Sequence, residues 1–96
     1  MKLSISDKAV NWYKEELKTA NTKYVRFFPR YGGVGGIVAG FSIGINFDQP
    51  ENVLASYKTD GMTFFIEQSD AWYFEGKTEL NIEFDEKLGE PQFIYS

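Results

Sequence analysis

Short segments of alternating apolar and polar residues limit the fold of this chain more than any other feature. In residues 41–47 every second side chain is apolar, and these four are Phe41, Ile43, Ile45 and Phe47. A period of two is that of a β-strand with one buried face. We therefore expect these residues to form one core-facing row. On that expectation Ile43→Ala costs about 2–5 kcal/mol, and Ser42→Ala costs much less.

Further strands are expected after residue 20, joined by short turns. They cover residues 24–31, 53–58, 62–67, 79–84 and 92–95. Thr59-Asp60-Gly61 indicates a tight hairpin, because Asp-Gly favours the positive φ angles that such turns need. Pro29 has no backbone N–H and indicates a sheet edge or a bulge. Short connections favour antiparallel pairing.

Residues 6–20 are the one substantial helix that the sequence predicts. Ser6 is a suitable N-cap, and Trp12 is expected at the flank of the core. Apolar residues recur at helical spacing, at Ala9, Val10, Tyr13, Leu17 and Ala20. A short helical turn, capped by Ser69, is expected over residues 69–75. This order predicts an α+β fold, predominantly β, with one N-terminal helix, a mostly antiparallel sheet arrangement and a short inserted helix.

Length and charge narrow the class of protein. The 96 residues provide for one core, so residues 1–96 are expected to form a single domain. The net charge of −4, without a run of Lys or Arg, opposes non-specific binding to nucleic acid. The N-terminus lacks the apolar stretch of a signal peptide, and no segment is long enough to span a bilayer. We therefore expect a cytoplasmic protein without a membrane partner.

The chain contains no cysteine and no histidine. Thiolates and imidazoles are the usual ligands of iron–sulfur clusters and zinc, so we expect no such cofactor. A Ser-His-Asp triad is excluded for the same reason. These exclusions favour a protein that is not an enzyme.

A set of short segments suggests a family. The start of the helix, Ile5-Ser6-Asp7-Lys8-Ala9, is followed by Arg30 to Gly33, Gly40 to Ser42 and Trp72 to Phe74. With these segments the chain resembles the HesB/IscA-like family, the A-type carriers of iron–sulfur cluster biogenesis, over residues 3–95. It is most similar to the divergent HesB-like branch of Gram-positive bacteria. The resemblance implies a HesB-like domain.

The departures from this family concern its chemistry. The resemblance implies one cysteine in the glycine-rich loop, near Val34, and a Cys-Gly-Cys motif at the C-terminus. Here the chain ends in Pro91 to Ser96 without that motif. The family's cluster-binding residues therefore transfer to no position of this sequence.

The glycine-rich loop is the leading candidate for a functional surface. Phosphate-binding loops open onto a helix and often carry a lysine, whereas a strand follows here and no lysine is present. Glycine lets the backbone approach a partner closely, and function concentrates in irregular loops on rigid scaffolds. The candidate partner-binding residues are Arg30, Tyr31, Gly32, Gly33, Val34, Gly35 and Gly36.

Other charged and aromatic residues have simpler interpretations. Arg26 shares a strand face with Arg30, and surface pairing with acidic residues is the favoured reading of both. Neighbouring carboxylates such as Asp48 and Glu51 are expected to be solvated. Trp72-Tyr73-Phe74 is expected to combine core packing with a partly exposed tryptophan.

Two classes of function stay open at this point. The first is a non-enzymatic binding or accessory protein, related to iron–sulfur carriers but lacking their cysteines, with another protein as partner. The alternative is a small-molecule-binding protein with an aromatic-lined pocket. An enzyme built on carboxylates has the least support.

Overall fold

The computed structural model describes residues 1–33 and 35–96. Its strands are β1 (Lys2–Ile5), β2 (Tyr24–Tyr31), β3 (Phe41–Asn46), β4 (Val53–Thr59), β5 (Met62–Glu67), β6 (Glu79–Asp85) and β7 (Glu90–Tyr95). Its helices are α1 (Asp7–Leu17) and the short 3-10 helix η1 (Gln68–Phe74). The expected α+β class, predominantly β, is confirmed. Neither helix has the length and apolar character needed to cross a membrane within the described residues.

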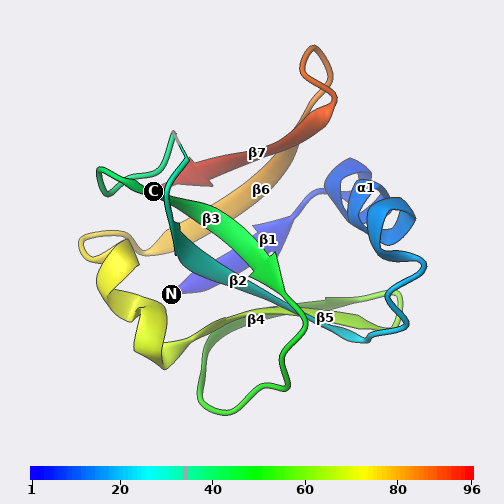
Figure 1. Cartoon of the computed structure of the whole chain (residues 1–96), viewed down its shortest axis with the longest axis horizontal. Helices are drawn as coiled ribbons and strands as arrows, with labels where there is room; N and C mark the ends of the chain where they lie inside the picture. Colours follow the sequence, from blue (N-terminus) through cyan, green and yellow to red (C-terminus); the bar gives the residue numbers. More distant parts are fainter. Residues whose placement is uncertain (34) are drawn as a thin grey trace.

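The strands form two sheets rather than one (Figure 1). One has the order β1-β6-β7 and the other the order β3-β2-β5-β4. Three of the five strand pairings are antiparallel, and the parallel ones are β1 with β6 and β2 with β5. Sequence reasoning missed β1, because four residues are too few for a reliable alternation signal.

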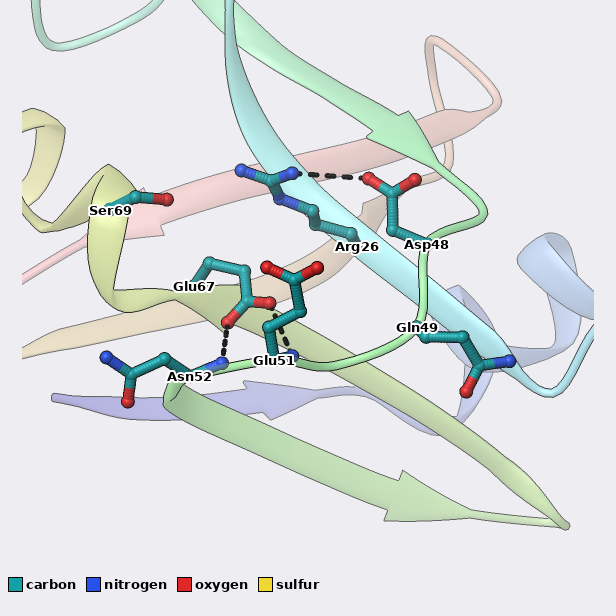
Figure 2. A pocket seen from close by; sticks show the side chains of 7 residues that line it. All are labelled: Arg26, Asp48, Gln49, Glu51, Asn52, Glu67 and Ser69. Carbon is teal, nitrogen blue, oxygen red and sulfur yellow. Dashed lines mark hydrogen bonds and ion pairs between the residues drawn. The ribbon is translucent and has the colours of Figure 1, made fainter.

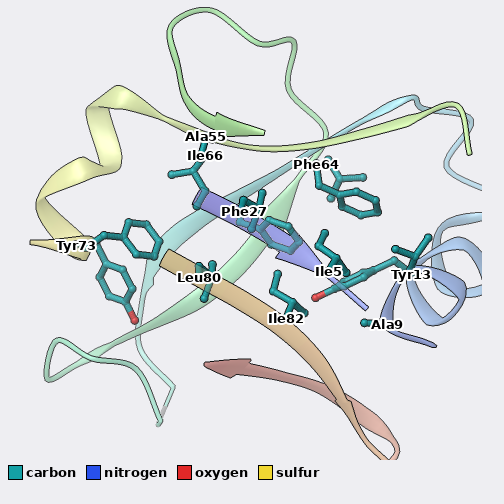
Figure 3. Close-up of a cluster of buried hydrophobic side chains, with 14 residues drawn as sticks. Ile5, Ala9, Tyr13, Phe27, Ala55, Phe64, Ile66, Tyr73, Leu80 and Ile82 are labelled. Atoms are coloured by element: carbon teal, nitrogen blue, oxygen red, sulfur yellow. The ribbon is translucent and has the colours of Figure 1, made fainter. Parts of the chain in front are cut away.

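The core lies between the two sheets and α1 (Figure 3). Phe27 of β2 stacks on Phe64 of β5 at 5.9 Å between ring centroids, and Tyr13 of α1 contacts both rings at 5.7 Å. Leu80 and Ile82 of β6 close the core from the other sheet and are fully buried. Each aromatic pair adds roughly 0.5–1.5 kcal/mol beyond its buried area. The aromatic-rich composition is therefore used mainly for packing.

The predicted core-facing row of residues 41–47 is correct only in its first half, because Phe41 and Ile43 pack against the core whereas Ile45 and Phe47 are exposed. Phe41 and Ile43 are only half-buried at the margin of the core, and Ile45 and Phe47 are 38% and 47% exposed. Apolar and polar residues alternate along β3 as predicted. Because β3 is an edge strand, however, the second half of its apolar row lies beyond the rest of the core. Burial depends on what covers a face, which alternation does not encode.

Local signals predicted turns and one cap well. Asp60 and Gly61 have φ angles of 49° and 76°, so the β4–β5 hairpin turns where Asp-Gly predicts it. The Ser6 side chain caps α1 by accepting a hydrogen bond from the Ala9 N–H at 3.2 Å. The predicted cap of the short helix is wrong, because η1 begins at Gln68 and Ser69 lies inside it.

Pro29 lies within a six-residue ladder without a bulge. The Gly32 N–H donates to the Gly40 carbonyl at 2.6 Å, and bonded and non-bonded pairs alternate along an antiparallel ladder. Counting from this bond, Pro29 and Ile43 form a non-bonded pair, so the missing N–H of Pro29 faces away from β3. On that side β5 pairs with β2 only up to Arg26. Pro29 therefore removes no ladder bond.

Candidate functional site

The candidate loop leaves the end of β2 and returns at the start of β3. Ser42 closes it by donating its hydroxyl to the Gly32 carbonyl at 3.0 Å. The Tyr73 hydroxyl of η1 accepts a hydrogen bond from the Ile37 N–H at 3.2 Å. The loop is therefore fastened to both β3 and η1. Of the predicted partner-binding residues, Val34 lies outside the described residues.

At two positions of the loop, steric contacts explain why the residue is glycine. A Cβ at Gly36 would collide with the Phe41 carbonyl and the Tyr73 hydroxyl, although the Gly36 φ angle is not in the positive region. At Gly33, which has a φ of 76°, it would meet the Ser42 side chain. The glycine content thus serves the close packing of this loop, in addition to any contact with a partner.

Three aromatic side chains form a continuous ridge beside the loop. Tyr31 is 83% exposed and its ring meets Phe41 edge to face at 5.5 Å. Phe41 in turn meets Trp72 of η1 at 5.3 Å, and Trp72 is 49% exposed. We call Tyr31, Phe41 and Trp72 the aromatic ridge. Sequence reasoning singled out Tyr31 and Trp72 separately. The ring contacts that connect them through Phe41 form only in the tertiary structure.

Arg30 is exposed and borders a groove between the edge strands β3 and β7, here called the β3–β7 groove. Its volume is about 640 Å³. Aromatic rings from α1, β2 and β7 line it, namely Trp12, Tyr13, Phe28, Phe93 and Tyr95. Gly35 and Gly36 of the loop lie at one end. The structure thus brings Arg30 and two of the predicted glycines together on one concave surface.

A second, polar pocket of about 410 Å³ is lined by Arg26 of β2, by the segment between β3 and β4, and by Glu67 and Ser69 (Figure 2). The Arg26 guanidinium donates to Asp70 at 2.7 Å and to Asp48 at 3.2 Å. The hydrogen bond to Asp70 raises the pKa of Arg26 above its ordinary value, so this side chain stays charged. The Glu67 carboxylate, which is buried, accepts backbone N–H bonds from residues 51 and 52 at 2.8 and 2.9 Å.

These contacts give the polar pocket a structural role, since they connect separate elements of the fold; we call them the brace. Arg26 ties β2 to η1 and to the segment after β3, and Glu67 holds the segment before β4. The expected pairing of Arg26 with acidic residues is confirmed, whereas Glu67 and Asp70 were not predicted as its surroundings. Their carboxylates are engaged in these bonds rather than opposed as an acid–base pair. Within residues 1–33 and 35–96, no cluster of three acidic, His or Cys side chains could hold a metal ion.

Comparison with known proteins places the chain among relatives of similar length. It is 44% identical over 95 residues to a Bacillus subtilis protein named Pyruvate dehydrogenase inhibitor, with 99% of each chain covered. The chain belongs to the family of this Bacillus protein. A Staphylococcus saprophyticus relative described as uncharacterised is 40% identical over 78 residues, covering 78% of this chain and 80% of the relative. The expected origin of relatives in Gram-positive bacteria is confirmed.

A search of protein-family models finds none that matches this sequence. The fold has a solved counterpart in the crystal structure of IscA with the [2Fe-2S] cluster. The TM-score is 0.57 at 17% sequence identity, over 98% of this chain and 80% of IscA. This similarity shows that the expected HesB/IscA-like fold is present. IscA was solved with a cluster, while this chain has none of the thiols that hold such clusters.

Proposed function

We propose that this chain is a non-enzymatic protein that binds pyruvate dehydrogenase and lowers its activity by contact. The observation that carries the proposal is the 44% identity to the Bacillus subtilis inhibitor over 99% of both chains. Similarity along the entire length supports a shared binding surface as well as a shared fold.

The arrangement of side chains favours inhibition by contact over inhibition by chemistry. The chain supplies no cysteine nucleophile and no histidine base. Its most exposed large aromatic residue, Tyr31, stands next to Arg30 at the end of β2. Tyr, Trp and Arg dominate the energetics of protein interfaces. We therefore assign the contact surface to Arg30, the candidate loop and the aromatic ridge.

The test is an inhibition assay with purified Bacillus subtilis pyruvate dehydrogenase, followed through NADH formation. The wild-type protein is expected to reduce the rate in a saturable manner. The double variant R30A/Y31A is expected to need at least about tenfold more protein for the same inhibition, since each hot-spot residue contributes more than about 1 kcal/mol. Its thermal unfolding is expected to match the wild type, because Tyr31 is 83% exposed.

Leu88→Ala provides the matched control. Leu88 is also a large exposed apolar residue, at 70%, but it lies in the β6–β7 turn, far from the candidate loop (Figure 1). This variant is expected to inhibit as well as the wild type. Equal inhibition by R30A/Y31A and wild type would place the contact elsewhere. An enzyme unaffected by the wild-type protein would refute the proposed function itself.

An accessory role in iron–sulfur cluster biogenesis is the second candidate, supported by the IscA-like fold alone. If the chain acts there, it does so through protein contacts, since its cluster ligands are lacking. Anaerobic reconstitution with iron and sulfide, followed by desalting, is expected to yield colourless protein without bound sulfide. A stable brown protein with stoichiometric sulfide would contradict this prediction and revive the carrier role.

A further inference from the structure

Among residues 1–33 and 35–96 the two sheets have four edge strands, and of these four only β3 lacks a feature that discourages strand pairing. β4 carries Lys58 and an irregularity between Val53 and Ala55, β7 begins with Glu90 and Pro91, and β1 contains Lys2. Charges, proline and bulges are the usual protection of sheet edges. The six residues of β3, FSIGIN, include no charge and no proline, and their ladder has no bulge.

The backbone of β3 offers free hydrogen-bonding groups along this edge. The Gly32–Gly40 bond makes Arg30–Ser42 and Phe28–Gly44 bonded pairs, and Ile43 and Ile45 non-bonded positions. The N–H and C=O groups of Ile43 and Ile45 therefore point away from β2. Both residues line the β3–β7 groove. Four backbone groups thus face a groove with an aromatic lining.

The two ends of the groove carry opposite charges. Arg30, whose register partner in β3 is Ser42, lies at the end of the groove next to the loop. Tyr95 lies at the same end, because its ring centroid is 6.3 Å from that of Tyr73, whose hydroxyl is bonded to the loop. Glu90 lies at the other end of β7. At about 3.3 Å per residue, the five steps from Glu90 to Tyr95 span about 16 Å. The groove is therefore as long as a five- or six-residue strand.

We infer that the β3–β7 groove binds an extended peptide segment of a partner protein, which pairs with β3 as an added strand. The segment has alternating apolar side chains over the aromatic lining, an acidic residue at Arg30 and a basic residue at Glu90. Main-chain bonds supply affinity in this mode, and the side-chain pockets and end charges supply specificity. A second copy of β3 is a poorer occupant, since its uncharged sequence satisfies neither Arg30 nor Glu90.

This inference rests on the proposed function only for the identity of the partner, so its first test is independent of pyruvate dehydrogenase. A phage-displayed library of random heptapeptides is selected on the immobilised wild-type protein. The enriched peptides are expected to alternate apolar residues and to carry opposite charges at their two ends. On binding such a peptide, the amides of Ile43 and Ile45 are expected to exchange hydrogen at least about tenfold more slowly.

Ile45→Pro and Ile45→Ala form a matched pair of variants. Both remove the Ile45 side chain, which is 38% exposed, but only proline removes the outward N–H. I45P is expected to bind the selected peptides at least about tenfold more weakly than I45A. In the assay with pyruvate dehydrogenase, I45P is likewise expected to be the weaker inhibitor. Circular dichroism and thermal unfolding are used to check that both variants are folded.

Several outcomes would overturn the inference. The first is that the library shows no enrichment over blank beads, and the second is that I45P and I45A bind the peptides with equal affinity. The third is that hydrogen exchange slows at Phe93 and Tyr95 instead of in β3. The fourth is that this chain forms a dimer through β3. Peptide binding without inhibition of pyruvate dehydrogenase would refute the proposed function and leave the groove assignment standing. Inhibition without any peptide binding would refute the groove assignment alone.

Discussion

Phe27→Ala is expected to cost about 3–5 kcal/mol of the free energy of unfolding. Phe27 is fully buried, and its ring contacts Tyr13 of α1, Phe64 of β5 and Phe93 of β7. The substitution removes the ring on which both sheets and the helix converge, and it leaves a cavity that the surroundings fill only in part. Small domains have about 5–15 kcal/mol of stability, so a large share is lost. Urea denaturation with an unchanged m-value measures the difference.

The adjacent residue provides the control. Phe28 points to the opposite face of β2, is only half-buried and rests on Gly44 of β3. Phe28→Ala is expected to cost less than half as much as Phe27→Ala, because the remaining space is open to solvent. Equal losses for the two variants would mean that the assigned inward face of β2 is wrong. Ile43→Ala, at a half-buried position, is likewise expected to fall below the 2–5 kcal/mol that alternation alone suggests.

Arg26→Met is expected to destabilise the protein by about 2–3 kcal/mol, the cost of leaving a buried charged acceptor without its partner. Asp70 retains only 12% side-chain exposure and accepts from Arg26 at 2.7 Å. Methionine keeps much of the apolar stem of arginine but offers no donor. The Asp70 carboxylate then stays poorly solvated inside the polar pocket. Thermal and urea unfolding at neutral pH measure the loss.

Two further variants separate the brace from a surface ion pair. Asp48→Asn is expected to cost less than about 1 kcal/mol, because the Asp48 side chain is 40% exposed. The double variant R26M/D70N is expected to recover part of the loss of R26M, since a neutral amide is easier to bury than a carboxylate. If R26M and D48N lower the free energy of unfolding by equally small amounts, the bond between Arg26 and Asp70 does not stabilise the fold and the brace has no energetic role.

Local signals predicted much of this structure. The bounds of β2 match residues 24–31, and the β4–β5 hairpin turns at Asp60 and Gly61. These features are encoded within a few residues, by β-propensity and by the φ angles that Asp-Gly favours. The cap at Ser6 is of the same kind. Helix α1 nevertheless ends at Leu17 rather than at residue 20, since fraying and tertiary context set the last turn.

Non-local features escaped prediction. The pairing of β1 with β6 joins residues 2–5 to residues 79–82, and no local pattern encodes such a partner. The burial of Glu67 and Asp70 was also missed, because acidic residues are usually exposed and their partners here lie on other elements. For the candidate site, the sequence indicated Arg30, Tyr31 and the glycines, but neither the aromatic ridge nor the β3–β7 groove.

The sequence by itself determined which metal ligands this protein lacks. With no cysteine and no histidine, the usual cluster and zinc ligands are lacking whatever the fold. It also determined the alternation of β3, which is a property of neighbouring residues. Only the tertiary structure decided that β3 lies at an edge, with Ile45 and Phe47 exposed and a groove beside it. The physical reason is that an open edge and a concave surface arise from the placement of distant segments, here β2 and β7, around one strand.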